Sequence, residues 1–143
     1  MRILGLDIGS KRIGVAVSDE LGFTAQGLET LTCSDPNVAV RLVGDLVLRY
    51  GVDEIVIGMP YDMNGTEGPQ AKKVRGFMER LAMEVHVPLR EWDERLSTVA
   101  AERALLEANL SRSKRRKIVD KVAAVLILQA YLDMRRHGDQ SNG

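Results

Sequence analysis

The fold of this chain is decided by ILGLDIGSKRIGVAV, residues 3–17 of a sequence of 143. Residues 2–8 predict a strand with apolar side chains on both faces, as in the middle of a sheet that is covered on both sides. A short polar turn leads to residues 13–18, whose larger side chains alternate as in a second strand. Asp7 lies near the end of the first strand, where a carboxylate loses several kcal/mol of hydration unless a cation, hydrogen-bond donors or solvent compensate it. Because Gly9 and Gly14 let backbone approach a bulky polar ligand, the stretch points to a site that holds metal or phosphate.

The remaining elements alternate between helix and strand. Residues 23–31 can supply a third strand, so that the first three strands form an antiparallel meander. Ser34 or Asp35 can cap the next helix, which Gly51 ends. Strands are predicted at residues 53–58 and 85–92, and helices at residues 69–83, 97–109 and 115–136. This order predicts an α/β fold with a five-stranded mixed sheet and helices on both of its faces. We expect a single domain over residues 1–137 and a disordered tail over residues 138–143.

Composition excludes several classes of protein. Twenty basic and twenty acidic side chains cancel, so an anionic partner must be held by local clusters of charge. The single cysteine, Cys33, excludes an internal disulfide and fits a reducing compartment. No secretory signal is visible, and the longest later apolar run, residues 122–128, is far shorter than the ~20 residues that span a bilayer. We therefore expect a soluble, cytoplasmic protein without a membrane partner.

Two further carboxylates stand at the ends of predicted elements. Glu94 follows the last strand, at the kind of edge where ligands collect in sheets with helices on their faces. Alternation places Asp93 and Glu94 on opposite sides, so only one of them should point into a shared site. Alternatively, Asp93 and Glu94 have no role in a site, and their negative charges only stabilise the N-terminus of the next helix. Asp120 lies on the core-facing stripe of a helix that is apolar nearly all round, in line with Ala124. A carboxylate there needs a partner, although the helix dipole alone can also favour it.

Three carboxylates on three separate elements suit a divalent metal site. Hard ions such as Mg²⁺ take oxygen ligands, and a pair of them can activate water and stabilise the leaving oxygen in phosphodiester hydrolysis. The spacing alone does not show that Asp7, Glu94 and Asp120 converge. Basic residues cluster near these carboxylates, which favours contact with a phosphate backbone over an ordinary solvated loop. They are Lys11, Arg12, Arg95, Arg112, Lys114, Arg115 and Arg116.

Four segments together resemble the YqgF family, the Holliday junction resolvases and pre-16S rRNA nucleases of bacteria. The segments are DIGSKRIGVAV at residues 7–17, GMP at 58–60 with NGTE at 64–67, DERLST at 93–98, and KIVDKVAA at 117–124. They occur in the order of the family and span nearly the whole chain. Met59 is a mild departure, because the family often has leucine at this position.

The resemblance implies a ribonuclease H-like fold in which carboxylates of the first strand, the last strand end and the final helix meet over two Mg²⁺ or Mn²⁺ ions. By this comparison, Asp7, Glu94 and Asp120 are the metal ligands and the catalytic residues. The comparison also implies that the substrate groove is lined by Lys11, Arg12, Thr66, Arg95 and Thr98. Members of the family are described as maturing the 5′ end of the precursor of 16S ribosomal RNA, and some as cutting branched DNA.

The leading hypothesis is therefore a metal-dependent nuclease that acts on structured RNA, with the small ribosomal subunit as a candidate partner. The alternative keeps the chemistry but takes four-way DNA junctions as substrate, which requires two separated active sites and hence a dimer. The sequence reveals no dimer surface, so a monomer and a homodimer both stay open. A sugar kinase or actin-like ATPase has a similar phosphate loop, but it needs two such domains to enclose ATP. An RNA-binding factor without activity is expected to lack one of the carboxylates, and none of the three is missing.

Overall fold

The computed structural model describes the backbone of residues 1–32, 34–109 and 112–142, and their side chains apart from those of residues 100, 107, 109, 112–117 and 139–142. Cys33, the single cysteine, lies outside the described residues. Strands and helices follow one another in the predicted order. They are β1 (Ile3–Ile8), β2 (Arg12–Ser18), β3 (Ala25–Gly27), β4 (Leu31–Thr32), α1 (Pro36–Tyr50), β5 (Glu54–Met59), α2 (Pro69–Glu84), β6 (Leu89–Asp93), the 3-10 turn η1 (Glu94–Leu96), α3 (Val99–Asn109) and α4 (Arg112–Asn142).

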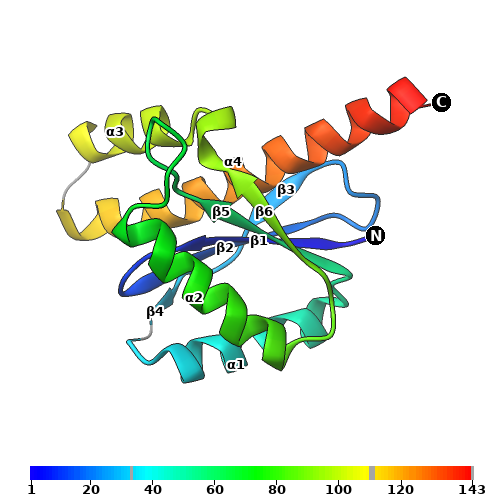
Figure 1. Cartoon of the computed structure of the whole chain (residues 1–143), viewed down its shortest axis with the longest axis horizontal. Helices are drawn as coiled ribbons and strands as arrows, with labels where there is room; N and C mark the ends of the chain where they lie inside the picture. Colours follow the sequence, from blue (N-terminus) through cyan, green and yellow to red (C-terminus); the bar gives the residue numbers. More distant parts are fainter. Residues whose placement is uncertain (33, 110–111, 143) are drawn as a thin grey trace.

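The strands form one mixed sheet in the order β3-β2-β1-β5-β6, with β4 also paired to β2. β1 pairs antiparallel with β2 and parallel with β5, and β5 pairs parallel with β6. α1 and α2 cover one face of the sheet, and α3 and α4 cover the other (Figure 1). The predicted α/β class, with a mixed sheet and helices on both faces, is confirmed.

The sheet has six strands where the sequence predicted five, because the third predicted strand is broken in two. In β3, Gly27 pairs with Ala16, whereas in β4, Thr32 pairs with Arg12. From the first pair to the second, the chain advances five residues on the β3–β4 side but only four residues on the β2 side. The segment between β3 and β4 therefore has one extra residue. An extra residue of this kind is a β-bulge, which interrupts the ladder. The count of five is therefore wrong, and the alternation of polarity in the sequence carries no signal for a bulge.

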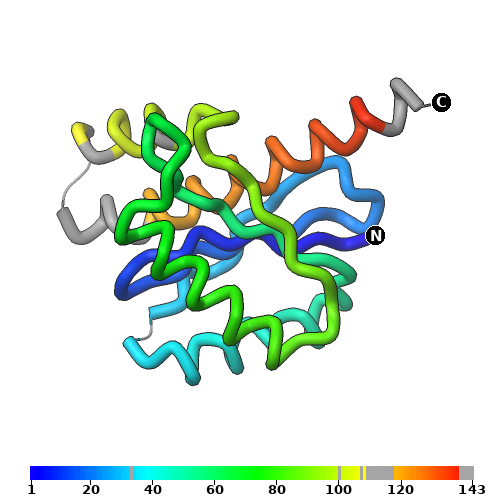
Figure 2. The backbone as a smooth tube through the Cα atoms, viewed as in Figure 1, coloured from blue at the N-terminus to red at the C-terminus, as the bar shows by residue number. Residues whose placement is uncertain are grey.

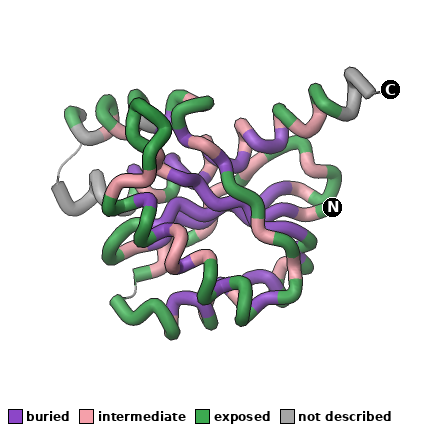
Figure 3. Tube along the Cα trace, in the orientation of Figure 1, coloured by how far each residue is buried: buried purple, intermediate pink, exposed green. Residues whose placement is uncertain are grey.

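Two apolar cores lie on the two faces of the sheet. Leu4, Leu6 and Ile8 of β1 pack toward α1 and α2, whereas Ile3 packs toward α4. All residues of β1 are buried, and so are those of β5, which form the purple centre of Figure 3. Both faces of the strand are covered, which explains why the sequence is apolar at nearly every position of β1.

The ends of α1 follow the predicted signals. The Asp35 carboxylate accepts a hydrogen bond from the backbone N–H of Asn37 at 2.9 Å, and Pro36 occupies the first turn. Gly51 ends the helix in the left-handed conformation, with φ of 60°. Of the two cap candidates, Asp35 is therefore the one that caps the helix.

The last helix is longer than predicted. The sequence predicted a helix over residues 115–136 and a disordered tail over residues 138–143, but the backbone of α4 is helical from Arg112 to Asn142. Once the middle of a helix is held by packing, each added residue gains a hydrogen bond without a new nucleation step. Residue 143 lies outside the described residues, and the disorder of the tail over residues 138–143 stays a prediction. The single domain over residues 1–137 stays a prediction. Within the described part of the chain, no helix is both long and apolar enough to span a membrane.

Candidate functional site

Asp7 lies on the α4 side of the sheet, between two glycines. Its register partner in β2 is Gly14, and the parallel pairing of Leu6 with Ile57 brings Gly58 of β5 beside it. Asp7 itself is only 9% exposed. Because the neighbours on both sides carry no side chain, the space over the Asp7 carboxylate is left to residues from other elements.

Asp120 reaches this space because α4 lies very close to β2. A Cβ atom added to Gly14 would stand 2.0 Å from the carbonyl oxygen of Asp120, so only glycine fits there. A Cβ atom added to Gly5 would stand 2.7 Å from the Cβ atom of Leu128. Ala124 is fully buried in the same contact layer. Small residues on both elements thus let the helix approach the sheet, Ala124 on α4 and the glycines Gly5 and Gly14 on the strands.

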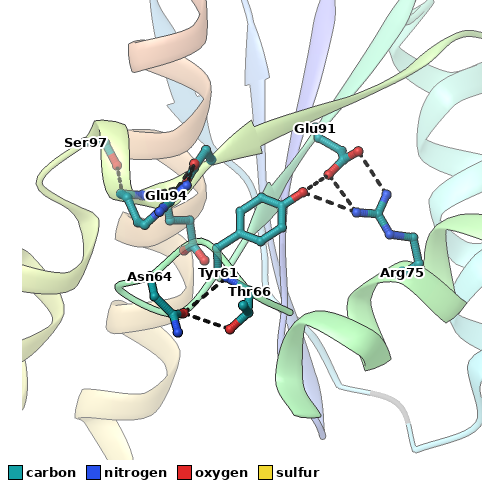
Figure 4. Close-up of polar contacts among 9 residues, drawn as sticks. Tyr61, Asn64, Thr66, Arg75, Glu91, Glu94 and Ser97 are labelled. Atoms are coloured by element: carbon teal, nitrogen blue, oxygen red, sulfur yellow. Dashed lines mark hydrogen bonds and ion pairs between the residues drawn. The ribbon is translucent and has the colours of Figure 1, made fainter. Parts of the chain in front are cut away.

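Glu94 is presented at the exit of β6, where it opens the turn η1. Glu94 is 9% exposed, whereas Asp93 turns aside to pair with the Arg95 guanidinium at 2.7 Å. The Ser97 hydroxyl donates to the carbonyl oxygen of Glu94 at 3.0 Å, which holds the turn (Figure 4). A Cβ atom added to Gly58 would stand 3.4 Å from the Glu94 carboxyl carbon. The glycine beside Asp7 therefore also makes room for Glu94, and only one acidic residue of the Asp93–Glu94 pair enters the site, as predicted.

Asp7, Glu94 and Asp120 line one pocket of about 200 Å³. The end of β1, the exit of β6 and the early part of α4 thus meet, which the sequence spacing could not show. α2 begins beside the turn between β1 and β2 (Figure 2), and Gln70 in its first turn donates to the carbonyl oxygen of Ile8 at 3.0 Å. This contact fixes the wall of the pocket next to Asp7.

Arg103 from α3 brings positive charge into the pocket. Its Nη2 atom lies 2.5 Å from an Asp7 oxygen and 3.0 Å from Glu94 Oε1. That Glu94 oxygen is buried and has no hydrogen bond among the described residues, so its contact with Arg103 is an ion pair only. Arg103 is not among the residues predicted from the sequence. Its signal was a basic residue one helical turn after Val99, which is fully buried.

Burial raises the pKa of Asp7 to about 7, because removal from water disfavours the charged carboxylate. Arg103 acts in the opposite direction, while the charges of Glu94 and Asp120 raise this pKa further. Burial also raises the pKa of Glu94, again against the effect of Arg103. Asp120 has its own partner, the Arg12 guanidinium at 2.8 Å. Two guanidiniums thus serve three carboxylates, and the site holds an excess of negative charge.

The donor set fits a divalent cation. As placed, no group of three His, Cys, Asp or Glu side chains among the described residues could bind one ion jointly. Arg103 takes the position between Asp7 and Glu94 that a metal ion needs. Carboxylate oxygens are the ligands preferred by Mg²⁺ and by Mn²⁺, and the buried Glu94 Oε1 has no hydrogen bond among the described residues and only the ion pair with Arg103. The residues therefore suit such an ion, and Arg103 is the cation that stands in for it.

Lys11 and Arg12 border the acidic pocket on one side. Together with Gly9, Ser10 and Asp120 they line a second hollow of about 370 Å³. Lys11 is exposed, whereas Arg12 is half-buried by its contact with Asp120. The structure thus places both predicted substrate-binding residues beside the carboxylates.

Neither Thr66 nor Thr98 is among the described residues that line the acidic pocket, and the contacts of both lie within their own segments. The Thr66 hydroxyl donates to the Asn64 side chain at 2.8 Å, inside the loop that follows β5 (Figure 4). The carbonyl oxygen of Thr98 accepts from the backbone N–H of Glu102 at 2.9 Å, at the start of α3. Their part in substrate binding stays a prediction.

Arg95 belongs to a network that joins this loop to β6. Its guanidinium lies 5.6 Å from the centre of the Tyr61 ring. The Tyr61 hydroxyl donates to Glu91 at 2.7 Å, and Arg75 of α2 pairs with Glu91 at 2.9 Å (Figure 4). Arg75 also pairs with Glu67 at 2.5 Å. The network holds the loop against β6, the strand that leads to Glu94. For Arg95, the structure therefore supports a positioning role, and direct contact with substrate stays a prediction.

The basic run before Asp120 forms the first turns of α4. The side chains of Arg112, Lys114, Arg115 and Arg116 lie outside the described residues, so their contact with a phosphate backbone also stays a prediction.

The fold has counterparts among solved structures. Thermus thermophilus RuvC in complex with a Holliday junction substrate is similar with a TM-score of 0.60 and 17% sequence identity, over 95% of this chain and 96% of that one. A second Thermus thermophilus RuvC structure gives a TM-score of 0.56 at 15% identity, over 96% and 97% of the two chains. The fold is thus RuvC-like and of the ribonuclease H type, which confirms the predicted fold class.

Sequence comparison identifies the family. The model of the RuvX family, described as Holliday junction resolvase, matches residues 1–134. A protein of Clostridium acetobutylicum named "Putative pre-16S rRNA nuclease" is 55% identical over 133 residues, which are 93% of this chain and 98% of the relative. A protein of the same name from Symbiobacterium thermophilum is 56% identical over 135 residues, 94% of each chain. The chain belongs to the RuvX family, which the sequence motifs indicated under the name YqgF.

Proposed function

We propose that this protein is a metal-dependent nuclease that hydrolyses phosphodiester bonds of structured RNA and matures the 5′ end of pre-16S rRNA in the cytoplasm. The observation that carries the proposal is the convergence of Asp7, Glu94 and Asp120 on one pocket beside Lys11 and Arg12. The names of relatives at 55% and 56% identity support this choice of substrate.

Asp7, Glu94 and Asp120 are the residues that would hold Mg²⁺ or Mn²⁺, as two ions. When bound, such ions supply positive charge against the phosphate and a water of lowered pKa. Asp7 is fixed in the sheet and Glu94 is fixed by η1, so their carboxylates are oriented before substrate arrives. Lys11 borders the same space with an exposed side chain and attracts the phosphate backbone. Arg103 compensates part of the charge of the two buried carboxylates, and it would be free to face the substrate phosphate where a metal ion supplied that charge instead.

The proposal predicts that Asp7→Asn lowers cleavage by at least about a thousandfold, or about 4 kcal/mol of barrier, because one carboxylate ligand is lost. The measurement is incubation of the purified variant and wild type with precursor small-subunit particles and Mg²⁺, with the new RNA ends mapped. Asp45→Asn is the matched control, since Asp45 is exposed on α1 and does not line the acidic pocket. Cleavage by Asp7→Asn at the wild-type rate would remove Asp7 from the mechanism.

A second candidate substrate is a four-way DNA junction, because the family model carries the description Holliday junction resolvase. Symmetric cutting of a junction requires two active sites, so this function goes with a homodimer. A four-way junction offered in parallel with the RNA, together with the molecular mass in solution, separates the candidates. Paired cuts in the junction by a dimer, without a new rRNA end, would favour the DNA function.

A further inference from the structure

A third hollow lies on the other side of the β1–β2 turn, between that turn, α1 and α2. It has a volume of about 290 Å³. Its floor includes the apolar residues Ile13, Ala39 and Phe77, and its rim carries Lys73 and Arg80, both exposed on α2. We call it the α2 groove. None of the sequence motifs pointed to it.

The α2 groove is continuous with the site already described. Ile8 and Gly9 line both the α2 groove and the acidic pocket. Ser10 lines both the α2 groove and the hollow that holds Lys11 and Arg12. All three hollows therefore meet at the Gly9–Ser10 corner of the turn. The backbone N–H of Gly9 donates to the Arg12 carbonyl at 2.8 Å, and this hydrogen bond closes the turn at this corner.

The charge of the groove is positive. No acidic side chain is among the described residues that line it. Asp35 lies beside it in the sequence, but its carboxylate accepts from the N–H of Asn37 and serves as the cap of α1. Arg80 donates to the neutral side-chain oxygen of Asn37 at 3.0 Å, so it is held in place while its charge is kept.

Arg75, another basic residue of α2, shows the contrast. The Arg75 guanidinium is used entirely within the protein, by Glu67 at 2.5 Å and Glu91 at 2.9 Å. Lys73 and Arg80 have no carboxylate partner among the ion pairs of the described residues. Two cations over an apolar floor match a strand of nucleic acid, which presents phosphates on one side and sugars or bases on the other.

We propose that the α2 groove binds the nucleic-acid strand on one side of the cleaved bond, with Lys73 and Arg80 as phosphate-binding residues. The inference rests on the proposed nuclease function and extends it to a second contact region. The strand passes over the Gly9–Ser10 corner, with the scissile phosphate at the acidic pocket and the adjoining nucleotides in the groove. Lys73 and Arg80 hold the substrate and take no part in the chemical step.

The test measures binding in the Asp7→Asn background, so that the probe is not cut. Fluorescence anisotropy with a labelled pre-16S rRNA fragment, and in parallel with a four-way DNA junction, compares Lys73→Gln, Arg80→Gln and the double variant. Each single change should weaken binding about three- to tenfold and reduce the slope of log K against log[salt] by about 1, because one phosphate contact is lost. In otherwise wild-type protein, the double variant should raise KM and leave kcat unchanged.

Lys72→Gln and Arg49→Gln are the matched controls. Both residues are exposed and basic, and neither lines the α2 groove. They should leave affinity and salt slope at the wild-type values, and thermal melting checks that every variant is folded. Shortening the probe at one of its two ends should lower the affinity of wild-type protein to that of the double variant. Shortening it at the other end should leave the affinity unchanged.

The outcomes are distinguishable. If Lys73→Gln and Arg80→Gln bind like Lys72→Gln and Arg49→Gln, the groove is not a substrate contact and the nuclease proposal is unaffected. If the protein without groove substitutions binds neither probe, both proposals are overturned.

Discussion

Glu54 and Asp7 are two buried carboxylates on the same face of the sheet, and their surroundings differ. Glu54 lies near the end of the sheet where β1 begins, and Asp7 lies near the end where β1 finishes. Glu54 opens β5 opposite Ile3, and Asp7 lies near the end of β1 opposite Gly14. Glu54 is 4% exposed and Asp7 is 9% exposed. Depth alone therefore does not separate them.

The number of partners separates them. Glu54 accepts a hydrogen bond from the Tyr131 hydroxyl and also lies 3.5 Å from Arg135 and 3.9 Å from Arg90. Its single negative charge thus faces two guanidiniums and a hydroxyl. Asp7 must share Arg103 with Glu94, and the charge of nearby Asp120 is also felt there.

The difference indicates what each site is built for. A buried carboxylate with an excess of donors stabilises the connection between elements, in this case β5 and α4. A group of carboxylates with too few cations costs stability and is retained where it binds something. The comparison leads to opposite expectations for the removal of the two charges.

The largest expected effect on stability is at Asp7. Its pKa is about 7 in the folded protein, whereas an aspartate in water has a pKa of 3.8. The contribution of Asp7 to stability is therefore fully present below about pH 4 and is lost as pH rises through 7. In EDTA at pH 8, Asp7→Asn should therefore be more stable than wild type by up to about 4 kcal/mol, and the difference should vanish near pH 4. Urea unfolding at a series of pH values measures it.

Added Mg²⁺ sharpens this result. Wild-type protein should gain stability from Mg²⁺ at pH 8, because a bound cation compensates the buried charges, and Asp7→Asn should gain far less. Equal stability of the two proteins in EDTA at pH 8 would mean that Arg103 already compensates Asp7 in full, and the contrast with Glu54 would disappear.

The second effect is expected at Glu54. Glu54→Gln removes the charge that faces Arg90 and Arg135, and it should lower the free energy of unfolding by about 1 to 3 kcal/mol. This expected loss of stability is smaller than for a fully buried ion pair, because the side chain of Arg90 is 57% exposed and that of Arg135 is 36% exposed. Denaturant unfolding measures the loss, and RNA cleavage below the melting transition should match wild type. A loss of cleavage in folded Glu54→Gln would contradict the assignment of Glu54 to structure.

The sequence could predict Asp7 because its signal is local. One acidic residue interrupts a strand that is apolar on both faces, and Gly9 and Gly14 follow within a few positions. Asp120 was predictable for a similar reason, as a carboxylate on the apolar stripe of a helix. In each case the burial of the element can be inferred from its own residues.

Glu54 and Arg103 could not be predicted in this way. Glu54 stands at the first position of a short strand, and its burial depends on Tyr131, which is 77 positions away. Arg103 lies on a helix of mixed polarity, and its role depends on two carboxylates from other elements. The bulge that splits the third strand also depends on pairing with β2. Contacts between distant segments carry this information, and local patterns do not.

The smallest effect is expected at the hydroxyl that completes the Glu54 end. Tyr131→Phe removes one buried hydrogen bond and should cost about 1 kcal/mol at pH 7. Burial, aided by the contact with Glu54, raises the pKa of Tyr131 to about 12 from the ordinary tyrosine value of 10.0. The neutral hydroxyl is thus favoured in the folded state, and its contribution is present below pH 10 and is lost as pH rises toward 12.

The difference in stability between wild type and Tyr131→Phe should therefore shrink between pH 10 and pH 12, as measured by urea unfolding at each pH. This window lies well above the window near pH 4 to 7 in which Asp7 acts, so the two ends of the sheet can be titrated separately. If the difference in stability between wild type and Tyr131→Phe stayed constant up to pH 12, the hydrogen bond from the Tyr131 hydroxyl to Glu54 would not contribute to stability in the way proposed. The contrast between the two carboxylates would then depend on the arginines alone.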